Sequence, residues 1–120
     1  MYKKIMYLWI MYSKELIKGT LKAIVLKLLS ENDRMYGYEI TQRVKELTDN
    51  KIVITEGALY PLLHKLEADN ILITESIEVN GRTRKYYRLT KTGKSSARLV
   101  VDEFIDFLAT MKLVLNAQQT

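Results

Sequence analysis

The sequence predicts a mainly α-helical α+β domain in which three helices precede a β-hairpin and one long helix follows it. The first observation behind this prediction is apolar spacing of helical period through the first half of the chain. The second is a β-branched stretch interrupted by Asn80-Gly81, a strong hairpin signal because a type I′ turn needs positive φ at two residues. The third is a heptad seam between Ala97 and Leu115, where apolar residues follow at intervals of four, three, four, three and four.

Length and composition suit one folded domain with a dimerisation appendage, and they argue against catalysis. Of the 120 residues 48% are hydrophobic and 28% charged, and the net charge of +5 weakly favours an anionic partner. The chain has no cysteine and one histidine, His64, which excludes thiol chemistry and His-rich metal sites and leaves one residue for any Ser-His-Asp triad. We therefore expect no enzyme activity, no metal and no cofactor, and a chain without cysteine suits a cytoplasmic location.

An apolar extension occupies residues 1–12. Its apolar run of about eight residues is too short for a membrane span, and no signal-peptide cleavage site follows it, so we expect no membrane contact. An apolar helix must bury one face, so we expect the extension to pack on a partner subunit or on the last helix, with Trp9 as an anchor. Met11 is an alternative to Met1 as the native start, because a Met-Tyr pair with a lysine close behind it occurs at both positions.

Two helices and a short extended segment are expected next. The first helix covers residues 13–31, with a wide apolar stripe that begins at Leu16. The second helix covers residues 36–47. Its expected inward residues are Ile40, Val44 and Leu47. The β-branched run Ile52-Val53-Ile54 is too short for a helix and is predicted to form a single rung beside the hairpin.

The third helix covers residues 55–70 and presents the most informative surface of the chain. Thr55 can cap its first turn by accepting hydrogen bonds from backbone N–H groups, and Asp69 and Asn70 form a polar stop. Pro61 lies inside the helix, where it costs up to about 3 kcal/mol, so another interaction must offset it. The inward stripe is Leu59, Leu62, Leu63 and Leu66. The outward side carries Glu56, Gly57, Tyr60, Pro61, His64 and Lys65.

The hairpin is predicted to run from Ile71 to Thr90. Three helices followed by a hairpin is the order of a winged helix-turn-helix, in which a recognition helix enters the DNA major groove. Between Gly81 and Val101 every charged residue is basic, whereas a solvated face usually mixes both signs. We interpret this run as a surface for phosphate contact rather than as a merely soluble one. Its basic residues are Arg82, Arg84, Lys85, Arg88, Lys91, Lys94 and Arg98.

The last helix is predicted to run from Lys91 to about Asn116, with more apolar surface than a single chain can leave bare. One solution folds the seam back on its own domain, and the other joins two copies in an antiparallel or crossed two-fold dimer. We favour the dimer, because the three-helix core has apolar faces of its own. The expected interface, and the wall of any effector cavity in it, comprises Trp9, Val101, Phe104, Phe107, Leu108, Met111 and Leu115.

From Glu15 to Leu115 the chain resembles the PadR family of transcriptional regulators. Three stretches carry the resemblance: YGYEI at 36–40, GALYPLLHKLE at 57–67 and GRTRKYYRLT at 81–90. The resemblance implies a homodimeric winged-helix repressor that binds a palindromic operator in double-stranded DNA. It also implies release of the DNA by a small aromatic effector, to which family members often respond. Ala58 and Asn70 depart from the Thr or Ser and the Gly that are usual in the family, and residues 1–12 have no counterpart there.

A two-fold dimer would place two recognition helices in successive major grooves, about 34 Å apart. Residues at the entry of the helix are expected at base edges, and later ones at phosphates. The hairpin cations are expected at phosphates or in the minor groove, while one of Tyr86 and Tyr87 packs inward and the other reaches the DNA backbone. The candidate DNA contacts are Tyr38, Thr55, Glu56, Gly57, Ala58, Tyr60, Pro61, His64, Lys65, Arg82, Arg84, Lys85 and Tyr87.

Alternatives remain open at the level of single residues and of function. Half-burial for packing is the alternative for Tyr60, and His64 is expected to be a surface donor rather than a catalytic base. A winged helix that binds protein instead of DNA would need an apolar patch on the exposed side of the third helix, where the sequence places polar residues. We divide the chain into an extension (1–12), a DNA-binding domain (13–90) and a dimerisation helix (91–120).

Overall fold

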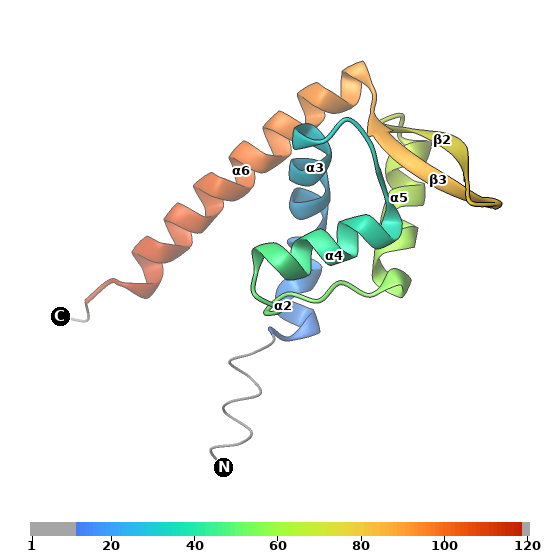
Figure 1. Ribbon diagram of the computed structural model, residues 1–120. Coiled ribbons are helices and arrows are strands. Elements are labelled where there is room, and N and C mark those ends of the chain that lie inside the picture. The colour runs from blue at the N-terminus through green and yellow to red at the C-terminus, as the bar shows by residue number, and fades with distance from the viewer. Residues whose placement is uncertain (1–11, 119–120) are drawn as a thin grey trace, which may run out of the picture.

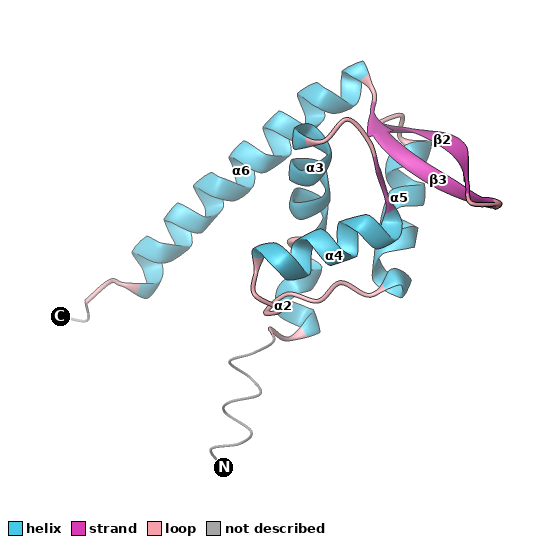
Figure 2. Ribbon diagram, viewed as in Figure 1, coloured by secondary structure: helices cyan, strands magenta, loops and turns pink. Residues whose placement is uncertain are grey.

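The computed structural model describes residues 12–118, and the side chains of Glu15 and Lys18 are left out of the description. Helices α3, α4 and α5 pack around one core, a small sheet covers one side of it, and α6 leaves the domain as a long arm (Figures 1 and 2). This is the predicted winged helix with a C-terminal helix. The elements are α2 (Lys14–Lys18), α3 (Leu21–Glu31), β1 (Met35–Tyr36), α4 (Gly37–Leu47), α5 (Glu56–Ala68), β2 (Leu72–Val79), β3 (Arg82–Leu89) and α6 (Lys91–Leu115).

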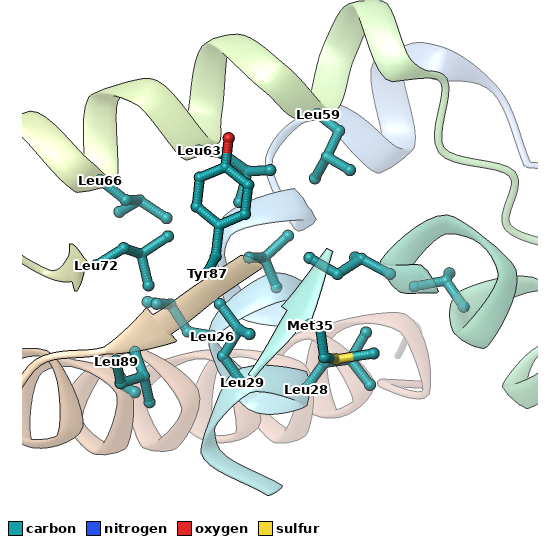
Figure 3. Close-up of a cluster of buried hydrophobic side chains, with 14 of the residues drawn as sticks. Leu26, Leu28, Leu29, Met35, Leu59, Leu63, Leu66, Leu72, Tyr87 and Leu89 are labelled. Carbon is teal, nitrogen blue, oxygen red and sulfur yellow. The ribbon is translucent and has the colours of Figure 1, made fainter. Parts of the chain in front are cut away.

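The core forms where the apolar stripes of three helices meet the inner face of the sheet. Leu59, Leu63 and Leu66 of α5 lie opposite Tyr87 of β3 and the apolar side chains of α3 (Figure 3). Burial of such side chains is the main favourable contribution to folding, about 1.5–3 kcal/mol for each large one. The buried apolar cluster comprises Val25, Leu26, Leu28, Leu29, Met35, Ile40, Val44, Ile54, Leu59, Leu63, Leu66, Leu72, Tyr87, Leu89 and Ala97.

The predicted single helix over residues 13–31 is wrong, because the chain breaks at Gly19 and Thr20 into α2 and α3. Ser13 caps the short α2 by accepting from the N–H of Leu16, and the Thr20 hydroxyl donates to the carbonyl of Ile17 at 2.7 Å. Leu16 is 61% exposed, so it does not join the apolar stripe that continues in α3. A local hydroxyl-to-backbone bond of this kind competes with the helical ladder.

The third strand of the sheet is β1, and the prediction that residues 52–54 would form it is wrong. Met35 pairs with Tyr87 and Tyr36 with Tyr86, so the strand order is β1-β3-β2. The run from Ile52 to Ile54 is irregular, and Ile54 is buried in the core, which accounts for its apolar composition without any pairing.

Helix α4 begins and ends close to its predicted limits, but one of its three inward residues was misplaced. Ile40 and Val44 are buried as predicted, whereas Leu47 in the last turn is 57% exposed. The chain turns away directly after it, through Asp49 and Asn50, which both have positive φ. No core therefore lies beside the last turn of this helix.

The hairpin has the predicted two-residue turn. Asn80 and Gly81 have φ of 51° and 77°, and Val79 pairs directly with Arg82. Side chains alternate between the two faces of a strand, so Tyr87 and Leu89 of β3 face the core while Arg84 and Tyr86 lie on the outer face.

Helix α6 is fixed to the domain only at its beginning. Thr90 caps it by accepting from the N–H of Gly93 at 2.8 Å, and Ala97 is buried against the core. Beyond this root the helix extends away from the domain (Figure 1), and Leu115 near its end is 75% exposed. The first turns of α6 thus pack on their own domain, which was the alternative to a dimer in the sequence analysis. The later turns extend away from the domain.

Burial also sets the acid–base behaviour of Tyr87, whose side chain is 1% exposed. Burial raises the pKa of its phenol above the ordinary value, and the Glu67 carboxylate and Tyr60 add to the shift in the same direction.

We predict that Gly93→Ala lowers the free energy of unfolding by about 1–3 kcal/mol, as overpacking in a filled space does. A Cβ at Gly93 would overlap the carbonyl oxygen of Ile71, which also accepts the Thr90 N–H. Chemical denaturation measures the effect. Gly19→Ala is the matched control, because nothing lies within 4 Å of its Cβ position; equal stabilities of the two variants would contradict the packing described for the root of α6.

We predict that Tyr87→Phe flattens the loss of stability at alkaline pH. With its pKa raised in the folded state, the neutral phenol stabilises the fold fully below the ordinary tyrosine pKa of about 10, and that contribution is lost as the pH rises above it. Denaturation of both proteins at pH values from about 8 to about 11 measures the difference. Parallel profiles would show that Tyr87 does not ionise more easily in the unfolded chain.

Candidate nucleic-acid interface

The outward face of α5 carries small and polar residues, and it does not pack against the core. Thr55 caps the helix by accepting from the N–H of Ala58 at 3.2 Å, as predicted. Pro61 lies within an uninterrupted helix, so the backbone hydrogen bond it lacks does not break the structure. The side chain faces away from Leu59, Leu63 and Leu66, whose burial supports the helix from the other side. The exposed residues are Thr55, Glu56, Gly57, Ala58, Pro61, His64 and Lys65.

Tyr60 differs from its neighbours on α5, because it packs between helices. It is half-buried, and its hydroxyl oxygen lies 2.5 Å from the place where a Cβ of Gly37 would be. Glycine at the first position of α4 therefore makes room for the Tyr60 ring. This contact favours the packing role that the sequence left open for Tyr60 over a contact with DNA.

Tyr87 does not belong to the interface, and its predicted contact with DNA is wrong. The alternation of β3 turns its ring into the core, where it is fully buried. Its neighbour Tyr86 lies on the outer face of the sheet, with its ring edge-to-face against Tyr36 at 5.3 Å between centroids. The sequence predicted that one of these two tyrosines would pack inward, but it did not show which.

The cations of β3 differ in how strongly they are engaged within the protein. Arg82 is exposed beside the turn and has no ion pair among the residues that the structure describes. The guanidinium of Arg84 lies 4.5 Å from the centroid of the Tyr36 ring. Lys85 and Arg88 lie 3.7 Å and 3.6 Å from the carboxylates of Glu67 and Glu75. The basic run seen in the sequence is therefore partly neutralised in the fold.

Arg34 and Glu75 lie on the outer face of the sheet beside these cations, and neither was predicted from the sequence. They form an ion pair across the sheet, and the Arg34 guanidinium lies 4.8 Å from the centroid of the Tyr86 ring. No local pattern in the sequence indicates these two residues. Arg34 comes next to Tyr86 only because β1 pairs with β3, and this pairing joins segments that are far apart in the sequence. These contacts hold β1 to the hairpin.

A hollow of about 560 Å³ separates the first turns of α5 from α2 and α3. Gly57, Ala58 and Pro61 form one side of it, and Lys14 and Lys22 lie on the other. Two further cations therefore flank the outward face of α5. The sequence alone did not place these lysines near α5, because their position depends on how the helices are arranged around the hollow.

The residues expected at a dimer interface lie along α6 beyond its root. Val101, Phe104 and Met111 are half-buried, and Phe107, Leu108 and Leu115 are exposed. The rings of Phe104 and Phe107 have centroids 6.3 Å apart. Trp9 lies outside the described residues. Within the described part of the chain, no helix combines the length and apolar character needed to cross a membrane.

Comparison with known proteins agrees with this architecture. The model of the PadR-like family of transcriptional regulators matches residues 25–99. A protein of Lysinibacillus sphaericus named only as uncharacterized protein X is 37% identical over 107 residues, which cover 88% of this chain and 97% of that protein. Transcriptional regulator Rv3488 of Mycobacterium tuberculosis is 34% identical over 69% of this chain and 74% of its own.

Among solved structures, a PadR family transcriptional regulator from Eggerthella lenta has a TM-score of 0.69 and 35% sequence identity, covering 87% of this chain and 88% of its own. The family match includes the helix α5, the hairpin and the root of α6, whose geometry is described above. The chain belongs to the PadR-like family of transcriptional regulators.

Proposed function

We propose that this regulator binds a palindromic operator as a homodimer and represses transcription there. The observation that carries the proposal is the outward face of α5, which is small and polar and stands beside a hairpin with a cationic tip. A helix with such a face can enter the major groove, while cations on either side of it contact the phosphates.

The beginning of α5 is suited to close approach to bases. Gly57 and Ala58 are exposed and small, so the helix backbone can come near the groove floor, and Ala58 can contact a thymine methyl group. Glu56 can accept a hydrogen bond from cytosine N4. His64 and Lys65 lie about two turns later, where the helix would leave the groove, and are better placed for phosphates.

Cations on both sides of α5 support the electrostatic part of binding. Arg82 stands at the tip of the hairpin, and Lys14 and Lys22 stand across the hollow beside α5. Each phosphate contact made by such a side chain releases counterions from DNA, so binding weakens as salt concentration rises. Tyr38, which is exposed at the beginning of α4, remains a candidate phosphate contact.

The exposed apolar surface of α6 supports dimerisation. Leu108, Leu113 and Leu115 are each more than half exposed, an arrangement that a helix in water does not tolerate without a partner surface. A second copy of α6 would cover the seam and place two α5 helices on one side of the assembly. The spacing of about 34 Å between successive major grooves sets the geometric requirement.

A small aromatic effector suits the same interface. Phe104 and Phe107 lie side by side on α6, and Met111 follows one turn later, which are the kinds of side chain that line sites for flat apolar ligands. Such a ligand would release DNA only if it bound the dimer more tightly in the arrangement that does not fit the operator.

A shift assay on the DNA upstream of the protein's own gene, repeated over a range of salt concentrations, tests the proposed function. We expect a complex that forms on this DNA in preference to unrelated duplex and that weakens as salt rises. Equal binding to all duplexes would overturn operator recognition. The rival function, a winged helix that binds only protein, predicts no complex with any duplex.

We predict that Arg82→Ala weakens binding to operator and to unrelated duplex alike, and lowers the slope of log affinity against log salt by about one. The reason is the loss of one phosphate contact at the hairpin tip. Fluorescence anisotropy at several salt concentrations measures both quantities. Lys27→Ala on α3 removes the same charge from another surface and should leave the slope unchanged; a loss confined to the operator would place Arg82 at a base.

We predict that Leu108→Glu shifts the protein from dimer to monomer and abolishes tight operator binding. A carboxylate in the seam would have to be buried against the partner's apolar residues, which disfavours association. Sedimentation equilibrium measures the mass. Leu99→Glu lies on the opposite side of α6 and is the matched control; a dimer that persists in the Leu108 variant would move the interface away from the seam.

A further inference from the structure

Glu67 connects the recognition helix α5 to the hairpin. It lies on the side of α5 that faces the sheet, and its side chain keeps 36% of its exposed area. One carboxylate oxygen, Oε2, accepts a hydrogen bond from the Thr74 hydroxyl of β2 at 3.1 Å. The other, Oε1, lies 3.7 Å from Nζ of Lys85 on β3. One side chain of α5 therefore contacts both strands of the hairpin.

The Lys85 ammonium is held from two directions. Glu67 attracts it from α5, and the ring of Tyr87 lies behind it, with Nζ 5.6 Å from the ring centroid. Lys85 shares the inner face of β3 with Tyr87, so it points toward α5 and away from the outer face, where Arg84 and Arg88 lie. In the free protein this cation is engaged by the domain itself.

An ion pair this exposed is weak, so a phosphate oxygen can take the ammonium from the carboxylate. The transfer still has a cost, because Thr74 keeps the carboxylate in place after Lys85 has left it. The Glu67 charge then remains uncompensated beside a polyanion, and the two repel each other. Every phosphate contact that Lys85 makes is thus weakened by its partner on α5.

We propose that Glu67 limits the affinity for DNA by holding Lys85 and by repelling phosphate, and so keeps the non-specific part of binding low. This inference rests on the proposed function. The effect does not depend on the DNA sequence, because the carboxylate acts on phosphate contacts, which all sequences share, and not on base contacts. Removal of the Glu67 charge therefore strengthens binding to every duplex. If the specific complex does not use Lys85, only the non-specific affinity gains from it, and the ratio of specific to non-specific affinity falls.

The experiment is a double-mutant cycle on the full chain: wild type, Glu67→Gln, Lys85→Ala and the double variant. Glutamine keeps an oxygen that accepts from the Thr74 hydroxyl while it removes the charge. Anisotropy titrations with operator and with unrelated duplex, at low and at high salt, give the affinities. We expect Glu67→Gln to bind unrelated duplex about three- to fivefold more tightly at low salt, with the gain fading at high salt.

The Lys85→Ala background separates this role from a general effect of charge. There the gain from Glu67→Gln should shrink markedly, because the lysine that it releases is missing. Glu103→Gln on α6 changes the net charge equally and is the matched control, for which we expect no gain in affinity. Thermal unfolding of each variant shows whether the hairpin remains folded.

Three outcomes overturn the inference. One is weaker binding by Glu67→Gln with unchanged thermal stability, which would make Glu67 a positioning residue for the hairpin instead. Another is an equal gain in the Glu103→Gln control, and the third is an undiminished gain in the Lys85→Ala background. In each of these cases the wild type still binds its operator, and the proposed function stands. A wild type that binds no duplex would overturn both.

Discussion

The burial of the inner face of β3 against α5 is the constraint on which the rest of the structure depends. Tyr87 and Leu89 enter the core together with Leu63 and Leu66, so strand and helix hold each other in one orientation. Side chains alternate along the strand, and the residues between the buried ones are therefore forced outward. The direction of Arg84 and the position of the hairpin beside α5 both follow from this one packing interaction.

The same constraint divides the basic residues of the hairpin into two groups. Lys85 shares the buried face and meets Glu67, whereas Arg84 and Arg88 share the outer face and meet Tyr36 and Glu75. On the hairpin, the positive charge of the sequence thus becomes two local networks and one cation at the tip, Arg82, that has no ion pair among the described residues. Charge that is available to a nucleic acid depends on strand register as much as on composition, because register decides which carboxylate each cation finds.

Elements that depend on neighbours in the sequence were predictable, and contacts that depend on distant residues were not. The cap at Thr55, the turn at Asn80-Gly81 and the limits of α6 follow from local chemistry, and all three are confirmed. The pairing of β1 with β3 was missed because nothing near Met35 reveals a partner some fifty residues away. The side on which Tyr87 lies was also not predictable, because it depends on which face of β3 packs against the distant residues of α5. The end of α2 at Gly19 was missed because the apolar spacing continues across it.

Because α6 is fixed to the domain only at its beginning, a small change of angle there moves its far end by a large distance. Only its first turns are fixed, by the Thr90 cap and the burial of Ala97, while the part of the helix beyond Ala97 is about 27 Å long. A tilt of about 7° at Ala97 displaces the end of the helix by about 3 Å, close to the rise of one base pair. In an assembly joined through two copies of α6, the small residues Gly93 and Ala97 would thereby govern the distances between half-sites that the dimer can span.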